Sequence, residues 1–174
     1  MVADRGLYVL LFTLCAFPAF PFQRSMSVAD IARAVRPSVV VITTQDQGGN
    51  PLEQGSGFIV ASDGLIATNV HVVDGAYSAT VELENGDVYD SVWVVAFDRR
   101  RDLALIRIKA LNLHPVRLGD SDNLKVGEHI TAIGNPSGLT DTVSDGILSA
   151  QRQVDGITLL QVTAPISPGS SGGP

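Results

Sequence analysis

Short apolar runs alternate with turn-forming residues along most of the chain. The runs are rich in Val, Ile and Leu, and Asp-Gly, Asn-Gly and Gly-Asn-Pro sequences separate them. This spacing is typical of an all-β barrel or sandwich rather than an α/β sheet. Nine strands are predicted, at residues 39–43, 57–60, 65–73, 79–83, 88–96, 103–108, 130–133, 142–149 and 157–163.

One short helix is predicted before the first strand. Val28, Ile31 and Val35 recur at helical spacing, and Pro37 ends the pattern. Ser27 is suited to the N-cap position, with Asp30 three residues later as in a capping box.

Two turn signals and one break organise the predicted strands. Asp63-Gly64 and Asn85-Gly86 are typical of tight hairpins, and residues 45–54 are predicted to form a polar loop. Residues 111–122 interrupt the strand rhythm with Pro, Gly and Asp. We therefore expect two β halves, with roughly six strands before this break and three after it.

The amino terminus differs from the rest of the chain. Residues 6–22 are uncharged and follow Arg5, which is the outline of an export signal. The stretch is short for a bilayer span and contains Pro18 and Pro21. Residues 1–24 are therefore expected to be an export signal, or a membrane anchor if they are not removed. Cys15 is the only cysteine, so an intramolecular disulfide is impossible.

Composition narrows the class of partner. A chain of 174 residues with 45% hydrophobic and 17% charged residues is in the range of a globular domain with a sizeable core. The formal net charge of −6 argues against nucleic acid or an anionic membrane surface as partner. A protein or a small molecule is expected instead.

The sequence SPGSSGGP, residues 167–174, raises the first question of chemistry. Glycines surround Ser171, as they would around a presented nucleophile, but also as in an ordinary turn or chain end. The pattern G-x-S-x-G also occurs in α/β-hydrolases. That fold is excluded by order, because its acid and histidine follow the serine and only three residues follow Ser171.

A serine nucleophile needs a base, usually a histidine held by a carboxylate. His114 and His129 have the character of surface residues, whereas His71 ends an apolar run just before a turn, where it could reach a cleft. Asp102 begins a predicted strand after three arginines. Each residue also has an ordinary explanation, His71 as a structural strand histidine and Asp102 as a solvated partner of a neighbouring arginine. The order His71, Asp102, Ser171, divided between the two β halves, favours a site in the crevice between them.

Four segments carry a family resemblance: GSGFIVASDGLIATNVHVV, DLALIRI, LGDSDNLKVGEHITAIGNPSGL and SPGSSGGP. In this order they resemble the HtrA/Deg family of trypsin-like serine proteases, from about Val28 to the end of the chain. The resemblance implies a chymotrypsin-like double β-barrel. It places a protease domain at residues 25–174, with a first barrel at about 38–110 and an incomplete second barrel at about 115–174.

The resemblance also assigns roles. By matching position, His71 is the base, Asp102 its orienting acid and Ser171 the nucleophile, with the backbone of Gly169, Ser170 and Ser171 as the oxyanion hole. The family usually has Asn where this chain has Ser170, and little loss is expected. No metal or cofactor is expected.

The implied function is endoproteolysis of unfolded or damaged proteins in the bacterial envelope. The family further suggests a homotrimer and cleavage after medium-sized aliphatic residues. Strands after the serine and any PDZ domain are expected to be absent from this chain, so that the 174 residues alone would be a poor enzyme. Two alternatives remain open here: a non-proteolytic chaperone or scaffold, and an inactive fragment of such a protease.

Overall fold

A computed structural model describes residues 26–134 and 142–174 of the chain. The predicted export signal at residues 1–24 lies outside these residues. The strands are β1 Val39–Gln45, β2 Pro51–Ala61, β3 Leu65–Thr68, β4 Ser78–Leu83, β5 Val88–Tyr89, β6 Val92–Asp98, β7 Leu103–Ile108, β8 His129–Gly134, β9 Thr142–Val154 and β10 Ile157–Val162. The helices are α1 Val28–Val35 and α2 Val70–Val73, and short 3₁₀ turns span Arg36–Ser38 and Ser121–Asn123.

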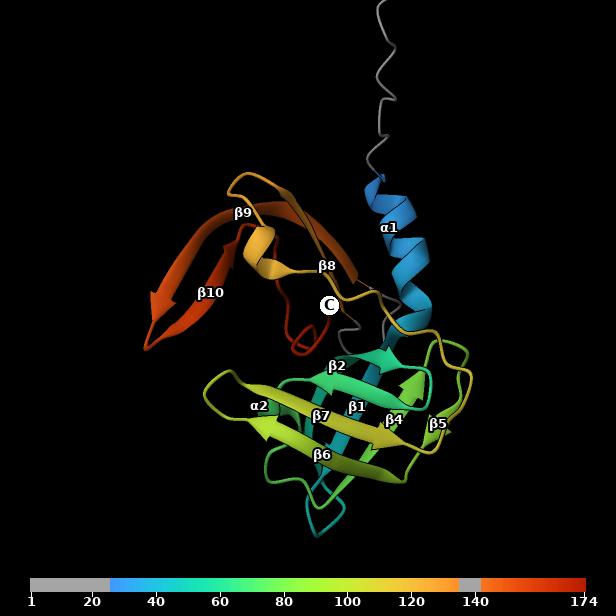
Figure 1. Ribbon diagram of the computed structural model, residues 1–174. Helices are drawn as coiled ribbons and strands as arrows, with labels where there is room; N and C mark the ends of the chain where they lie inside the picture. Colours follow the sequence, from blue (N-terminus) through green and yellow to red (C-terminus); the bar gives the residue numbers. More distant parts are fainter. Residues whose placement is uncertain (1–25, 135–141) are drawn as a thin grey trace, which may run out of the picture.

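The strands form two antiparallel sheets. The first has seven strands in the order β5-β4-β1-β2-β3-β7-β6, and the second has three in the order β10-β9-β8. The carboxyl end of the described chain lies between the two sheets (Figure 1). Two hydrogen bonds agree with this placement, because Ser171 O accepts from Ser56 N in β2 and Pro174 O accepts from Ile133 N in β8.

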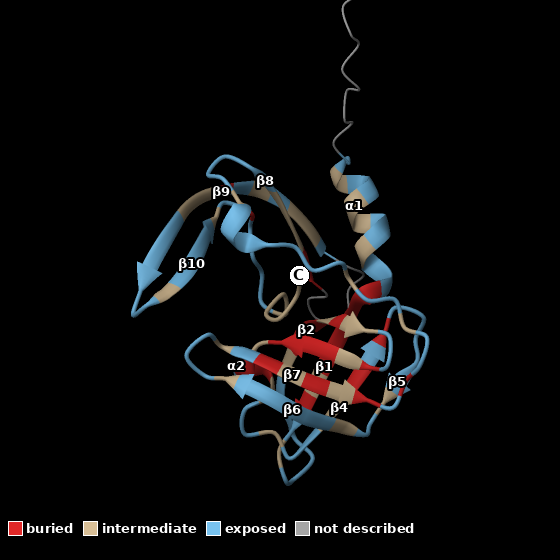
Figure 2. Cartoon of the chain, in the orientation of Figure 1, coloured by how far each residue is buried: buried red, intermediate tan, exposed pale blue. Residues whose placement is uncertain are grey.

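The core lies in the first sheet, where Figure 2 shows most of the buried residues. Strand β7 alternates buried and more exposed residues, as expected for a strand with one face on a core. The cluster comprises Val40, Ile42, Ile59, Ile66, Val72, Val81, Leu83, Ile106, Ile108 and Ala110. The first sheet therefore contains a packed core, and the connections that carry His71 and Asp102 extend from its strands.

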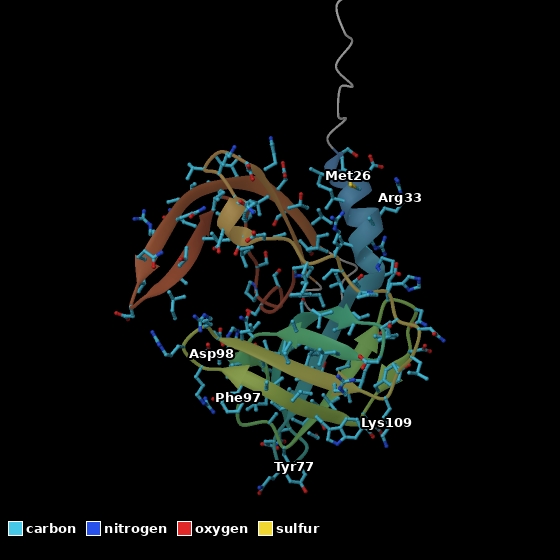
Figure 3. All side chains as sticks on the ribbon, viewed as in Figure 1. Met26, Arg33, Tyr77, Phe97, Asp98 and Lys109 are labelled. Atoms are coloured by element: carbon cyan, nitrogen blue, oxygen red, sulfur yellow. The ribbon has the colours of Figure 1, made fainter. Side chains whose placement is uncertain are left out.

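The predicted amino-terminal helix is confirmed. The Ser27 hydroxyl accepts a hydrogen bond from Asp30 N at 3.2 Å and donates one to Asp30 Oδ2 at 2.7 Å. The three apolar residues at helical spacing are half-buried. Arg33 in α1 and Met26 just before it are exposed, and α1 extends away from the first sheet (Figure 3). Within the described residues, no helix is long and apolar enough to cross a membrane.

The strand predicted at residues 65–73 is wrong in its second half. Strand β3 ends at Thr68, and residues 70–73 form α2, so the described chain contains a second short helix. The reason is tertiary: Val70 N and His71 N donate to Asp102 instead of to a neighbouring strand. These bonds outweigh the strand preference of the valines.

Two other boundaries differ from the prediction. Residues 88–96 do not form one strand but belong to β5 and β6, because β5 pairs with β4 whereas β6 pairs with β7. The structure thus has ten strands in its described part rather than nine. The polar loop predicted at residues 45–54 is shorter, since β2 begins at Pro51 and the Asp46 side chain accepts hydrogen bonds from Gly48 N and Asn50 N to close the turn.

Candidate active site

His71 and Asp102 meet where α2 faces the turn between β6 and β7. Nδ1 of His71 lies 2.6 Å from Oδ2 of Asp102, and the backbone N–H of His71 donates to Oδ1 at 3.0 Å. The side chains are 51% and 44% exposed. One carboxylate therefore fixes both the backbone and the ring of His71, and leaves Nε2 as the nitrogen available for proton transfer.

The backbone of Asp102 supports the same contact. Its carbonyl oxygen accepts from Asn69 Nδ2 at 2.7 Å and from Val70 N at 3.3 Å. Asp102 has φ of 52°, a left-handed conformation in which Asp is found more often than most residues. Asp102 thus satisfies the first N–H groups of α2, which have no partner inside a helix.

The three arginines before Asp102 do not pair with it. Arg99 Nη1 and Nη2 donate to Asp74, each at 2.8 Å. Arg101 donates to Asp98 within the turn at 2.6 Å, and Arg100 reaches the second sheet, where Asp155 O accepts at 2.6 Å. The alternative in which Asp102 is a solvated partner of a neighbouring arginine is therefore wrong.

Ser171 lies in a turn that is held on both sides. Ser56 N donates to Ser171 O at 2.8 Å and the Ser56 hydroxyl donates to Gly169 O at 2.7 Å, which binds the turn to β2. Inside the turn, Ser170 N donates to Ser167 O and Gly173 N donates to Ser170 O, each at 3.0 Å. Ser170, where the resemblance implies Asn, thus takes part in this turn through its backbone.

Close packing places this turn beside α2. Gly172 has φ of 83°, and a Cβ there would collide with Ser56 O and the Thr68 hydroxyl and lie 3.1 Å from Asn69 N. A Cβ on Gly55 would lie 2.7 Å from Val72 Cγ2 and 3.1 Å from Ser171 O. The Ser171 turn therefore lies against Asn69, two residues before His71, and shares Gly55 as a close neighbour with Val72.

Ser171 is not hydrogen-bonded to His71 in this structure. His71 and Ser171 both belong to the described chain, and no hydrogen bond joins the serine hydroxyl to the imidazole. In proteases without substrate, this bond is often long or poorly aligned. His71 and Asp102 are thus brought into direct contact, whereas Ser171 is brought to the same end of the sheet.

Two backbone donors in the serine turn are unpaired. Within residues 26–134 and 142–174, the N–H groups of Gly169 and Ser171 donate to no protein acceptor, whereas Ser170 N donates to Ser167 O. Gly169 has φ of 90°. Two free N–H groups separated by a single residue are suited to bind a negatively charged oxygen.

The other histidines lie elsewhere. His114 lines a cavity of about 450 Å³ beside β4 and β5, and Nδ1 of His129 lies 3.7 Å from Oδ2 of Asp145. In the part of the chain that the structure describes, no group of three or more His, Cys, Asp or Glu side chains could hold a metal ion. Asn69 and Ser56 were not predicted to belong to the site. Each binds a residue distant in sequence, Asn69 the carbonyl of Asp102 and Ser56 that of Gly169.

Comparison with known proteins decides the family. The trypsin-like peptidase domain matches residues 55–174. The serine protease HTRA1 of Xenopus tropicalis is 39% identical over 171 residues, which cover 90% of this chain and 37% of that protein. The chain belongs to the HtrA family of trypsin-like serine proteases. The resemblance carried by the four sequence segments is therefore confirmed.

Other HtrA-family members agree. A Chlamydia pneumoniae protein named "Probable periplasmic serine endoprotease DegP-like" is 44% identical over 126 residues, covering 70% of this chain and 26% of its own length. The solved structure of the HtrA-type protease AlgW with a tripeptide has a TM-score of 0.77 at 35% identity, covering 85% of this chain and 50% of that one. The predicted all-β, trypsin-like fold is confirmed.

The match in length is partial. This HtrA-family chain spans between 26% and 37% of the lengths of these two curated relatives. A serine endopeptidase from Yersinia pestis has a TM-score of 0.74 at 33% identity, covering 87% of this chain and 53% of that one. The residues that match the trypsin-like peptidase domain, 55–174, include His71, Asp102 and Ser171.

Proposed function

We propose that this HtrA-family protein is a serine endopeptidase that uses His71, Asp102 and Ser171. The observation that carries the proposal is the double contact of Asp102 with His71, at 2.6 Å to the ring and 3.0 Å to the backbone. Beside it lies a serine turn with two N–H groups that have no acceptor among the described residues. A site that only bound peptides would need no carboxylate to orient the imidazole.

The proposed reaction begins with attack by the Ser171 hydroxyl on the scissile carbonyl carbon. Nε2 of His71 takes the hydroxyl proton as the bond forms, and Asp102 stabilises the resulting imidazolium. The N–H groups of Gly169 and Ser171 stabilise the oxygen that becomes negative. His71 then returns the proton to the leaving amine, and water hydrolyses the acyl-enzyme by the same steps.

The proposed substrates are unfolded or damaged proteins outside the cytoplasm. The half-exposed His71 and Asp102 side chains are open to an extended polypeptide. The relative from C. pneumoniae is named a periplasmic serine endoprotease, which supports an envelope location. Residues 1–24 are the proposed export signal or anchor, and residues 25–174 the protease domain, with barrels at about 38–110 and 115–174. A homotrimer is the expected assembly.

Degradation of unfolded casein by the full-length protein tests the proposal. We expect steady cleavage by the wild-type protein and none by Ser171→Ala. Ser91→Ala is the control, because it removes an exposed hydroxyl in the connection between β5 and β6 and should retain cleavage. Equal cleavage by wild type and Ser171→Ala would overturn the assignment. Suppression of casein aggregation without cleavage would favour the chaperone alternative.

A further inference from the structure

The turn between β6 and β7 holds α2 at both ends. Asp102, at the end of this turn, bonds to the first residues of α2. Arg99, at its start, binds Asp74, the residue that directly follows α2. Phe97 and Asp98 lie where β6 enters this turn (Figure 3).

The Arg99–Asp74 pair has the geometry of a fixed contact. Both terminal nitrogens of Arg99 donate, one to each carboxylate oxygen of Asp74, at 2.8 Å. The Arg99 guanidinium also lies over the Phe97 ring, 5.4 Å from its centre. Its hydrogen bonds to Asp74 hold the pKa of that carboxyl below the ordinary value. Bidentate pairing with a planar guanidinium restricts orientation as well as distance.

The contacts His71–Asp102 and Asp74–Arg99 are separated by the same number of residues in both segments. His71 and Asp74 are three residues apart, as are Arg99 and Asp102. The Asp74–Arg99 pair thus joins the same two segments as the His71–Asp102 pair, three residues later in the chain at α2 and three residues earlier in the turn. It gives α2 a second attachment to the turn, besides buried Val70 and Val72 and the hydrogen bonds to Asp102.

We propose that Arg99 and Asp74 are positioning residues for the catalytic base. Their pairing fixes α2 so that the His71 ring keeps its contact with Asp102 and presents Nε2 toward Ser171. This inference rests on the proposed protease function and assigns a role to two residues outside the triad.

Arg107 and Asp63 supply a matched control. Arg107 Nη1 donates to Asp63 Oδ2 at 2.7 Å, and both side chains are partly exposed, as in the Arg99–Asp74 pair. This second pair joins β7 to the turn between β2 and β3, near the opposite end of β7 from Asp102. Its loss removes a similar ion pair without touching α2.

The experiment compares the full-length wild-type protein with Arg99→Ala, Asp74→Asn, the double variant and Arg107→Ala. An internally quenched peptide that the wild-type protein cleaves supplies kcat and KM. For Arg99→Ala and Asp74→Asn we expect kcat to fall about three- to tenfold with KM within about twofold, since alignment rather than binding is lost. The double variant should be no worse than the singles, because both remove one interaction.

Arg99→Lys should be intermediate in kcat, because an ammonium cannot reproduce the bidentate contact. Arg107→Ala should keep the wild-type kcat. A kcat for Arg99→Ala within about twofold of wild type, or the same fall in Arg107→Ala, would overturn the proposal.

Amide hydrogen exchange at His71 provides a readout that does not depend on catalysis. The His71 N–H donates to Asp102 Oδ1, so its exchange rate reports how well the helix is held. We expect faster exchange at His71 in Arg99→Ala and an unchanged rate in Arg107→Ala. Unchanged exchange in Arg99→Ala would overturn the positioning role. If the wild-type protein cleaves nothing, the protease function fails, and the exchange rates still decide whether the pair positions His71.

Discussion

The two sheets of this protein hold their halves of the site by different means. In the first sheet, residues such as Ile42, Ile66 and Ile106 are fully buried, and α2 with His71 is attached to that core through Val70 and Val72. The second sheet has few buried apolar residues in its described part, and β10 exposes Leu159 and Leu160 (Figure 2). Packing thus positions the histidine and the aspartate more firmly than the serine.

The serine turn depends instead on hydrogen bonds and on glycine. Ser56 binds the turn to the first sheet and Ile133 binds its end to the second. Gly172 lets the backbone approach Ser56 and Thr68 more closely than any side chain would allow. The difference shows that backbone contacts can place the Ser171 turn where the nearby core is small.

The largest effect is expected at the histidine of the packed half. His71→Ala should reduce casein cleavage by about four orders of magnitude or more, because the serine loses its base. Cleavage rates of purified full-length variants measure this. His114→Ala and His129→Ala should stay close to wild type. A comparable loss in either of them would contradict the choice of His71.

The next largest effect is expected on stability, which should fall more for a truncated side chain in the first sheet than for one in the second. Ile106→Ala removes a fully buried side chain of the first sheet and should lower the free energy of unfolding by about 2 to 5 kcal/mol. Leu159→Ala, at 50% exposure in β10, should lower it by less than about 0.5 kcal/mol. Urea unfolding measures both. Equal losses would show that the second sheet is as well packed as the first.

The serine turn should respond to a single methyl group. Gly172→Ala combines φ of 83° with collisions against Ser56 and Thr68, so the turn must shift and the cleavage rate should fall more than about tenfold. Gly86→Ala is the control, since Gly86 has φ of 86° but open space around it. That variant should lose some stability and keep its cleavage rate. A wild-type rate in Gly172→Ala would mean that the close contact is unimportant.

The smallest effect is expected when acid protonates Asp63, in the turn between β2 and β3. Hydrogen bonding from Arg107 holds the pKa of Asp63 below its ordinary value. A carboxyl with a lowered pKa stabilises the folded state above its unfolded pKa, and this contribution is lost as the pH falls through the folded one. The melting temperature of wild type should slightly exceed that of Asp63→Asn at pH 7, and the gap should close below about pH 4. A gap that is unchanged at pH 3 would contradict the pairing.

Much of the fold was predictable because it depends on local signals. Alternating apolar residues and the Asp63-Gly64 and Asn85-Gly86 turns predicted most strands. Helix α2 was missed because its first N–H groups are satisfied by Asp102, which follows His71 by 31 residues in the chain. The local sequence of residues 70–73, which is rich in valine, contains no sign of a contact with a residue so distant in the chain.

For the site, the sequence predicted the residues but not their contacts. The order of His71, Asp102 and Ser171 and the glycines around the serine are visible in sequence, and they select the residues without showing their contacts. The Arg99–Asp74 pair was not predicted, because three consecutive arginines give no sign of which carboxylate each will reach. Which arginine binds which carboxylate depends on how the turn between β6 and β7 lies against α2.

Labelling by a fluorophosphonate, followed by peptide mapping, tests whether Ser171 is a nucleophile activated by His71 and Asp102. The reagent reacts with a serine only when a base and an oxyanion hole activate it. We expect one adduct, on Ser171 of the full-length protein, that is lost in His71→Ala and strongly reduced in Asp102→Asn. An adduct on another residue, or labelling of Ser171 that is unchanged in His71→Ala, would contradict it.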